Sequence, residues 1–418
     1  MSKLIELNNF VKADNDVFHA PHNHEFAYTD GASTEQKLDE ILRNAKDLSS
    51  DSAELQTHVH DWPSEYHLSS SRANLLRALH LGGVTRILEL GCGCGSITRY
   101  LGEQAGVQVD AIEGSPTRAA LAALRCRDQS NVTISTANFN DLEMPQNHYD
   151  LVLYVGVTEY AGRFAAGKSD QEALQALLQM AKNACNDRGV TLVAIENRLG
   201  LKYMLGAKED HYAQAFVGID DYPQSTGIRT YSKDQWQQQI KSAGFANVQF
   251  LYPFPDYKIP TLIVNDSMAN AYVGMDKVGI DKAASNEERE FYKALGEFDS
   301  RDYNSDFSCQ NEDKLWQSLH QAGTFSIHAN SFLMLLSDSP ESIEAMANFS
   351  YRTYPAPRFE YLDKASAFEK LSHSKTSSTP SQTDHSAVAL ADELVLLKGS
   401  RGWRFLNVLR RLMGKQPV

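Results

Sequence analysis

Three glycines at alternate positions mark the first place in this sequence where chemistry is indicated. Gly91, Gly93 and Gly95 follow an apolar run that contains Glu89. Because glycine has no Cβ, the backbone there can turn sharply with positive φ and approach a ligand closely. The carboxylate of Glu89 would repel a phosphate group but would attract a cationic group. The pattern therefore predicts a ligand-binding loop that accepts a positively charged group.

A second carboxylate, Glu113, closes the next apolar run, Val107–Ile112. At the end of a strand such a carboxylate can accept hydrogen bonds from both hydroxyls of a ribose. Dinucleotide-binding loops read Gly-x-Gly-x-x-Gly and direct their turn at a pyrophosphate. Here the third glycine comes one position early, and Ser96 stands where that fingerprint requires glycine. The spacing therefore disfavours an NAD-dependent oxidoreductase, although Glu113 alone would suit NAD equally well.

The series acidic-x-Gly-x-Gly-x-Gly after a first strand resembles the first motif of class I methyltransferases, which use S-adenosylmethionine (SAM). The resemblance implies an α/β fold with a Rossmann-like sheet, mostly parallel with its last strand antiparallel, and SAM as the cofactor. It implies that the following residues bind the cofactor: Glu89, Gly91, Gly93, Gly95, Glu113, Gly114, Asn138, Phe139 and Gly156. The family usually has Asp at the position of Asn138, where an amide can still meet the edge of the adenine.

The elements that would position these residues alternate between strand and helix from Thr85 onward. Strands are predicted at 86–90, 108–112, 132–136, 149–154, 190–195 and 248–252. Helices are predicted between them at 96–104, 116–128, 171–185 and 233–242. Alternating units of this length indicate a parallel sheet with helices on both faces. In such a sheet ligands bind beyond the carboxyl ends of the strands, which is where the glycines and carboxylates stand.

Three further polar residues follow the fourth and fifth strands and are candidates for catalysis. They are Glu159, Glu196 and His211. Methyl transfer is an in-line displacement, so holding the reacting atoms in line can supply about 7–11 kcal/mol of the barrier. If the acceptor is a hydroxyl, a base among these residues would add about 10²- to 10⁴-fold. The simpler roles are a cap on the following turn for Glu196 and a surface position for Glu159.

Longer stretches resemble a bacterial group of methyltransferases that accompanies glycosyltransferases for surface polysaccharide of the O-antigen or lipopolysaccharide type. They run from Trp62 to Leu76, from Glu196 to His211 and from Tyr252 to Pro260, within a likeness over roughly residues 20–340. The group implies a sugar hydroxyl or a lipid-linked surface glycan as acceptor, with nitrogen acceptors left open. The alternative is a SAM-binding scaffold that regulates a glycosyltransferase complex without transferring methyl groups.

The 418 residues suffice for two or three domains. We expect a helical lead-in at 1–80, a methyltransferase core at 81–340 and a C-terminal extension at 341–371. Within the core, either 261–264 or 331–336 would be the reversed last strand. A helical insertion at about 266–328 would contain helices at 287–296 and 314–322. A linker rich in Ser, Thr and Pro is predicted at 372–386, followed by a basic amphipathic tail at 387–418.

The tail combines basic residues with Trp403 and other apolar side chains, and it contains no acid from Lys398 to Lys415. Such a segment suits an anionic membrane surface or the groove of a partner, for which a glycosyltransferase is the candidate. The simpler interpretation is a solvated helix packed on its own domain.

Composition excludes some functions. A formal net charge of −13 disfavours nucleic-acid binding, because contacts to phosphates require clustered Lys and Arg. The five cysteines show no paired spacing, which is typical of a reducing compartment. The first ten residues show no export signal, so we expect a cytoplasmic protein, peripheral at the inner membrane if the tail binds lipid. No metal site is expected, because a complete ligand set is missing around these histidines: His19, His22, His24, His58 and His60.

Overall fold

The computed structural model describes residues 2–21, 29, 31–165, 167–271, 286–295, 312–356 and 359. They belong to the first of two compact units, Met1–Leu362. The linker predicted at 372–386 and the basic tail predicted at 387–418 lie outside the described residues, as does much of the predicted insertion. No helix within the described ranges has the length and apolar character needed to cross a membrane.

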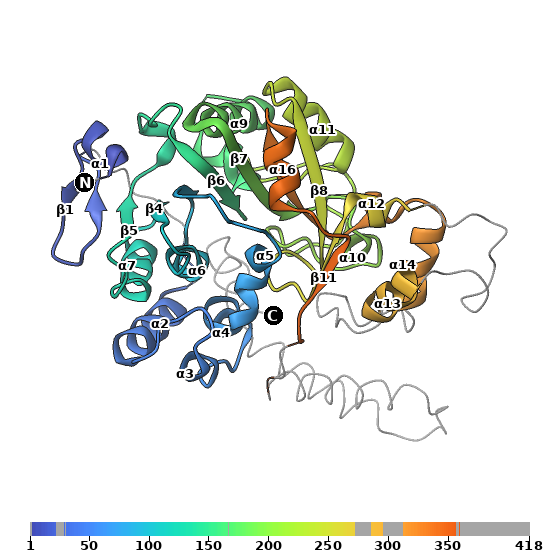
Figure 1. Cartoon of the computed structure of the whole chain (residues 1–418), viewed down its shortest axis with the longest axis horizontal. Helices are drawn as coiled ribbons and strands as arrows, with labels where there is room; N and C mark the ends of the chain where they lie inside the picture. The colour runs from blue at the N-terminus through green and yellow to red at the C-terminus, as the bar shows by residue number, and fades with distance from the viewer. Residues whose placement is uncertain are drawn as a thin grey trace, which may run out of the picture. The chain divides into compact units, whose positions relative to one another are not determined.

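An eleven-stranded sheet forms the centre of the described part (Figure 1). Its strands are β1 (Val11–Lys12), β2 (Phe18–His19), β3 (Arg86–Leu90), β4 (Gln108–Glu113), β5 (Val132–Thr136), β6 (Tyr149–Val155), β7 (Cys185–Glu196), β8 (Asn247–Phe254), β9 (Leu262–Asn265), β10 (Ser331–Ser337) and β11 (Tyr351–Thr353). Their order across the sheet is β1-β2-β5-β4-β3-β6-β7-β10-β8-β9-β11. The central strands β5, β4, β3, β6 and β7 run parallel. This is the mostly parallel α/β sheet that the sequence predicts.

The reversed strand is β10, which lies antiparallel between β7 and β8. Leu333 stands opposite Ala194 of β7 and Leu251 of β8. All of β10 is buried, as expected for a strand covered on both faces. The other candidate, 261–264, instead contributes to β9, which continues the sheet beyond β8 in antiparallel pairing and is followed by β11 at the edge.

Helices cover both faces of the sheet and join its strands (Figure 1). Before the first central strand they are α1 (Lys3–Leu7), α2 (Ala32–Asn44), α3 (Ala53–Gln56), α4 (Trp62–Leu68), the 3₁₀ turn η1 (Ser70–Ala73) and α5 (Asn74–Arg77). Between the central strands they are α6 (Ser96–Gly102), α7 (Pro116–Arg125), η2 (Phe139–Asp141), η3 (Thr158–Tyr160), α8 (Ala161–Phe164) and α9 (Asp170–Ala184). The remaining ones are α10 (Leu201–Met204), α11 (Lys233–Ser242), α12 (Asp266–Ala269), α13 (Asn286–Leu295), α14 (Glu312–Gln321), α15 (Phe325–His328) and α16 (Pro340–Met346).

Alternating residues of the central strands enter two separate apolar clusters. Leu88 and Leu90 belong to the cluster that also contains Leu174 of α9, whereas Ile87 belongs to the one that contains Ala119 of α7. This alternation follows from the period of two along a strand. Because both faces are packed, the carboxyl ends of the strands form a rigid edge on which a site can be built.

The N-terminal segment is not only helical, as the sequence analysis expected. Strands β1 and β2 form a hairpin, and β2 pairs in parallel with β5, so that the hairpin extends the central sheet. Two residues per strand are too few to show a period of two, which is why the pattern was missed. The helix α4 begins at a capping box. The Asp61 side chain accepts a hydrogen bond from the backbone N–H of Ser64, and the Ser64 hydroxyl oxygen accepts one from the backbone N–H of Asp61.

Candidate active site

A cavity of about 310 Å³ lies where the central parallel strands end. Glu89 of β3, Glu113 of β4, Val155 of β6 and Glu196 of β7 all line it, so four neighbouring strand ends contribute. Its lining also includes Trp62, Tyr66 and Arg72 from the N-terminal segment and Tyr257 and Lys258 from the turn after β8. The position is that expected for a ligand site in an open α/β sheet.

The glycine loop leads into one side of this cavity. Gly91, Gly93 and Gly95 have φ values of +80°, +57° and +81°, which side chains rarely adopt. A Cβ on Gly91 would lie 2.4 Å from a methyl of Val157, and one on Gly95 would lie 2.8 Å from the Cα of Ala122 in α7. Gly91 and Gly93 line the cavity, whereas Gly95 lets α6 and α7 pack and is outside the lining. Gly95 therefore has a packing role, and its predicted contact with the cofactor stays a prediction.

Glu113 is held by the loops on either side of it. Its Oε2 accepts the backbone N–H of Gly93 at 2.8 Å, and its Oε1 accepts that of Ser115 at 3.0 Å. Gly114, between them, lines the cavity as well. Each carboxylate oxygen has a second lone pair, so a ligand with two adjacent hydroxyls can still donate to this group.

Glu89 is buried beside the same loop and accepts a 2.7 Å hydrogen bond from Thr98 Oγ1. Burial raises the pKa of Glu89 to about 8, against the opposing effects of Thr98 and of the positive charge on Arg72. In the ligand-free protein this carboxyl therefore holds its proton at neutral pH. A ligand cation beside it would favour the ionised form.

Arg72 is a lining residue that the sequence analysis did not single out. Its Nη1 donates to the carbonyl oxygens of Tyr257 and Lys258 at 3.1 and 2.8 Å, and its Nη2 donates to the Tyr66 hydroxyl at 3.2 Å. The guanidinium also lies 4.6 Å from the centroid of the Tyr66 ring. These contacts fix a positive charge in the cavity close enough to Glu89 to oppose the rise of its pKa. The signal was the Trp62–Leu76 stretch of the family resemblance, which contains both residues.

The adenine contact predicted for Asn138 stays a prediction. Asn138 does not line the cavity, and its Oδ1 accepts the backbone N–H and the side-chain N–H of Asn140, each at 3.1 Å. An Asn that precedes a turn commonly bonds to the backbone two residues later. Phe139 and Asn140 line the cavity instead. Gly156 also lines it, with φ of +67°, and a Cβ there would lie 2.7 Å from the Tyr257 hydroxyl oxygen.

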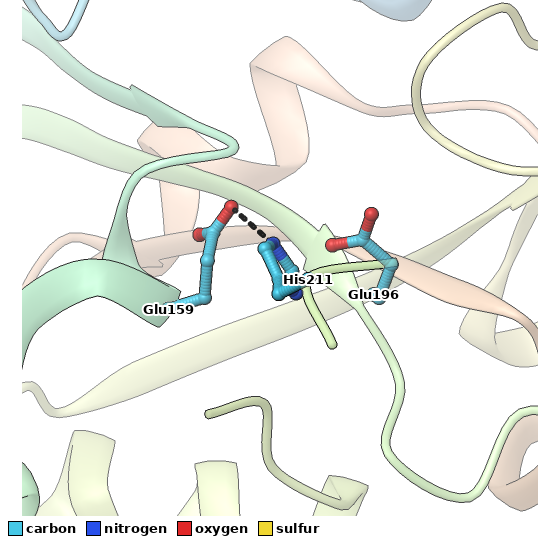
Figure 2. A group of neighbouring side chains, drawn as sticks. All are labelled: Glu159, Glu196 and His211. Atoms are coloured by element: carbon cyan, nitrogen blue, oxygen red, sulfur yellow. Dashed lines mark ion pairs between the residues drawn. The ribbon is translucent and has the colours of Figure 1, made fainter. Parts of the chain in front are cut away.

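The three predicted catalytic residues all line the same cavity and lie beside one another (Figure 2). His211 Nε2 lies 3.6 Å from Glu159 Oε1, and Figure 2 shows Glu196 on the other side of the imidazole. Glu159 is 3% exposed and Glu196 1%, so the surface position considered for Glu159 is wrong. Glu159 lies in η3, Glu196 is the last residue of β7, and His211 lies in the segment after α10.

His211 is held by carboxylates on both of its nitrogens. Its Nδ1 lies 3.0 Å from Glu209 Oε1, opposite the Glu159 contact. Burial lowers the pKa of His211, but the side-chain contacts with Glu159 and Glu209 and the negative charges of Glu196 and Glu159 outweigh this and hold the pKa well above its usual value. Burial also raises the pKa of Glu159. In this ligand-free state the imidazole is therefore cationic at neutral pH.

Glu196 belongs to a buried network of charges. Lys258 Nζ lies 2.5 Å from Glu196 Oε1 and 2.5 Å from Asp210 Oδ1, and Lys202 Nζ lies 3.3 Å from Asp210 Oδ2. Tyr203 donates its hydroxyl to the same Asp210 carboxylate. Burial raises the pKa of Asp210, but the two lysines outweigh this and hold it well below its usual value. The network fixes Glu196 through one oxygen, and the sequence analysis identified no residue of it except Glu196.

Comparison with known proteins decides the class of this site. Residues 87–186, from β3 to the start of β7, match the family model described as a methyltransferase domain. The chain contains a class I SAM-dependent methyltransferase domain. The glycine loop and Glu113 lie within the matched segment, and SAM is the cofactor of this methyltransferase. No curated protein matches the chain.

Solved structures show distant likenesses to this methyltransferase. A chain of the complex between the Haloferax volcanii Trm112 methyltransferase activator and a methyltransferase is 15% identical, covering 64% of this chain and 88% of its own, with a TM-score of 0.37. Phosphoethanolamine N-methyltransferase 2 of Haemonchus contortus, solved with phosphomonomethylethanolamine and S-adenosylhomocysteine, is 16% identical over 64% of this chain, with a TM-score of 0.36. The match covers 52% of that enzyme. Likenesses at this level carry no information on the acceptor.

Proposed function

We propose that this methyltransferase transfers the methyl group of SAM to a hydroxyl of a sugar or of a lipid-linked surface glycan. The observation that carries the proposal is that two groups of residues line one cavity. In this proposal the first, the cofactor end, is the glycine loop with Glu89 and Glu113, and the second, the acceptor end, is Glu159, Glu196 and His211. A cofactor held by the first group and an acceptor held by the second would meet inside the cavity.

The first end fits SAM by the character of its groups. Gly91 and Gly93 line the cavity at positive φ, a conformation that favours glycine, and without a Cβ this backbone can approach a ligand closely. Glu113 would receive the ribose hydroxyls, and Phe139 would lie against the adenine. Arg72 and Glu89 offer opposite charges for the carboxylate and the ammonium of the amino-acid end. When bound, SAM supplies the activated methyl group.

The second end is built to receive hydrogen bonds from an acceptor. Among the described residues, Glu159 Oε2 and Glu196 Oε2 are buried without a hydrogen-bond partner. An acceptor that brings hydroxyl groups would satisfy both oxygens, and a buried carboxylate without such a partner is unfavourable. A hydroxyl must also lose its proton when it becomes an ether, and these carboxylates stand where that proton would be released. The arrangement therefore favours a hydroxyl acceptor.

Aromatic side chains at the rim support a sugar in particular. Trp62 and Tyr66 line the cavity with ring centroids 6.1 Å apart, and Tyr160 lines it beside His211. A sugar ring has an apolar C–H face that packs on such rings and hydroxyls that hydrogen bond at its edge. The association with glycosyltransferases for surface polysaccharide rests on the resemblance of the Trp62–Leu76 stretch and its companions.

Two measurements test this proposal on the purified full-length protein. Calorimetric titration should show saturable binding of SAM and of S-adenosylhomocysteine but not of NADH. Incubation with methyl-labelled SAM and a panel of glycans should then place the label on a sugar oxygen. Label on an amine but on no hydroxyl would overturn the acceptor class. Binding of SAM without transfer to any sugar, lipid-linked glycan or amine would favour the scaffold alternative.

A further inference from the structure

One set of side chains in the described part of the chain could hold a metal ion. The set is Glu159, Glu196 and His211, whose ligand atoms all lie within 4.8 Å of one another (Figure 2). It differs from the histidines considered in the sequence analysis. Of those, His60 Nδ1 is instead 2.7 Å from the backbone oxygen of His58.

The spacing of the set suits a small cation. The 3.6 Å between His211 Nε2 and Glu159 Oε1 is too long for a good hydrogen bond. Nitrogen and oxygen ligands lie about 2.0–2.2 Å from a bound first-row metal ion, so neighbouring ligands of one ion are roughly 3–3.5 Å apart. Small rotations of the Glu196 side chain would bring its carboxylate to the same ion. The distances between these ligand atoms are therefore slightly longer than those expected around one bound ion.

Unpartnered oxygen atoms provide an independent observation. Within the described ranges, Glu159 Oε2 and Glu196 Oε2 are both buried and make no hydrogen bond. The other oxygen of Glu196, Oε1, lies 2.5 Å from Lys258 Nζ, so Oε2 is the atom that remains open to a metal ion. Buried carboxylate oxygens are normally satisfied by a donor or by a metal. Two such atoms beside one imidazole are available as ligands of a cation.

The imidazole is oriented as a metal ligand would be. Glu209 Oε1 lies 3.0 Å from His211 Nδ1, while Glu209 Oε2 accepts the backbone N–H groups of His211 and Tyr212 at 2.7 and 2.9 Å. The two backbone hydrogen bonds fix the position of Glu209, and Glu209 in turn orients the imidazole ring of His211. Metal-bound histidines commonly donate their other ring N–H to a carboxylate in this way. The arrangement directs Nε2 to the side on which Glu159 lies.

The charge of the surroundings also favours a cation. This buried region contains five carboxylates and two lysines that pair with some of them. The carboxylates are Glu159, Glu196, Glu209, Asp210 and Asp256, and the lysines are Lys202 and Lys258. Carboxylates exceed lysines by three when His211 is neutral. A divalent ion would offset most of this excess, and binding it would require His211 to give up the proton on Nε2.

We infer that Glu159, Glu196 and His211 form a binding site for one divalent first-row metal ion, such as Mn²⁺ or Zn²⁺, at the acceptor end of the cavity. One imidazole with two carboxylates suits these ions better than Ca²⁺ or Mg²⁺, which take oxygen ligands. The binding inference stands on the contacts above. A role in methyl transfer rests on the proposed function, in which open coordination positions of the ion would orient the acceptor hydroxyl.

The test is metal binding by the full-length protein after treatment with a chelator and in the absence of SAM. Titration with Mn²⁺, with free Mn²⁺ followed by electron paramagnetic resonance, should give one ion per chain, and Zn²⁺ should compete for it. His211→Gln and Glu196→Gln should each weaken Mn²⁺ binding by at least tenfold, and Glu209→Gln should weaken it by about 10- to 100-fold through the ligand it orients. His148→Gln, which changes a partly buried histidine just before β6, should leave Mn²⁺ binding unchanged.

Calorimetric binding of SAM shows whether each variant has folded, because the residues to which the proposal assigns SAM, the glycine loop with Glu89 and Glu113, are unchanged in these variants. If neither ion binds the wild-type protein, or if His211→Gln binds Mn²⁺ as tightly as the wild type, the metal site is overturned. Methyl transfer to a sugar that persists in excess chelator would then leave the proposed function intact. Transfer that stops with chelator and returns with Mn²⁺ would support both.

Discussion

The backbone N–H of Gly93 donates a 2.8 Å hydrogen bond to Oε2 of Glu113. This bond joins the loop after β3 to the end of β4, the two segments that would hold the amino-acid end and the ribose of SAM. Ser115 fixes the other oxygen of the same carboxylate from the opposite side. The carboxylate therefore has a single orientation before any ligand arrives, which lowers the entropy that binding must remove.

Glu113→Gln should weaken SAM binding by about tenfold or more, because the amide replaces one acceptor oxygen with a donor group that faces a backbone N–H. The measurement is calorimetric titration with SAM. Glu344→Gln, at an exposed glutamate of α16, is the matched control and should bind SAM as the wild type does. An unchanged dissociation constant for Glu113→Gln would contradict the assignment of the ribose to this carboxylate.

Gly91→Ala should lower the free energy of unfolding by about 1–3 kcal/mol, because the residue has φ of +80° and its new Cβ would lie 2.4 Å from a Val157 methyl. Urea denaturation measures the change. Gly83→Ala is the control, because Gly83 has φ of +88° but nothing within 4 Å of a Cβ. Equal losses in the two variants would show that the contact with Val157 is unimportant.

The central strands were predictable because their apolar runs are long and are separated by helices of the expected length. Strands β3 and β5 have the bounds that the pattern indicates, and β7 differs in starting at Cys185, where a helix was expected to end. The position of β10 between β7 and β8 depends on pairing across more than eighty residues, which no local pattern reveals. The pattern could only offer two candidates for that strand.

The site was predictable where ligand groups follow strands directly, and less so where loops bring distant residues together. Glu159, Glu196 and His211 meet as a group because they come from or follow neighbouring strands, although their chemical roles remain predictions. Lys258 lies 62 residues from its partner Glu196, and neither the spacing nor the composition indicates that contact. Arg72 likewise reaches its backbone partner at Tyr257 across 185 residues.

Glu89→Gln should stabilise the ligand-free protein with a gain that depends on pH. The folded pKa of Glu89 is about 8, raised by burial above its usual 4.5. Between these values the unfolded chain is ionised while the folded protein keeps the proton, so wild-type stability falls as pH rises from about 4.5 to 8. Glutamine does not titrate, so the stability of the variant does not fall over this pH range for this reason.

The free energy of unfolding of Glu89→Gln should therefore exceed that of the wild type by about 1–3 kcal/mol at pH 8, with little difference at pH 4.5. Urea denaturation at the two pH values measures it. The variant should also bind SAM more weakly, since it cannot ionise beside the ligand's ammonium group. A difference that does not vary with pH would show that Glu89 is ionised in the folded state.

Trp62→Ala should raise the KM for a glycan acceptor by about tenfold and change SAM affinity less, because the indole is an exposed ring in the lining of the cavity on which a sugar can pack. Trp62 is 42% exposed, so its removal should change the melting temperature little. Phe216→Ala removes an equally exposed aromatic ring that does not line the cavity and should affect neither constant. Equal effects of the two substitutions on KM would contradict a sugar-stacking role.

Glu159→Gln should lower kcat for methyl transfer to a hydroxyl by about 10²- to 10⁴-fold, because the amide can neither accept the released proton nor bind a cation strongly. Its affinity for SAM should stay within about twofold of the wild type, since the proposal assigns SAM to the glycine loop, Glu89 and Glu113 and not to Glu159. Formation of S-adenosylhomocysteine with saturating acceptor measures kcat. Glu172→Gln, at the exposed start of α9, is the control. A Glu159→Gln variant with wild-type kcat would place the reaction elsewhere in the cavity.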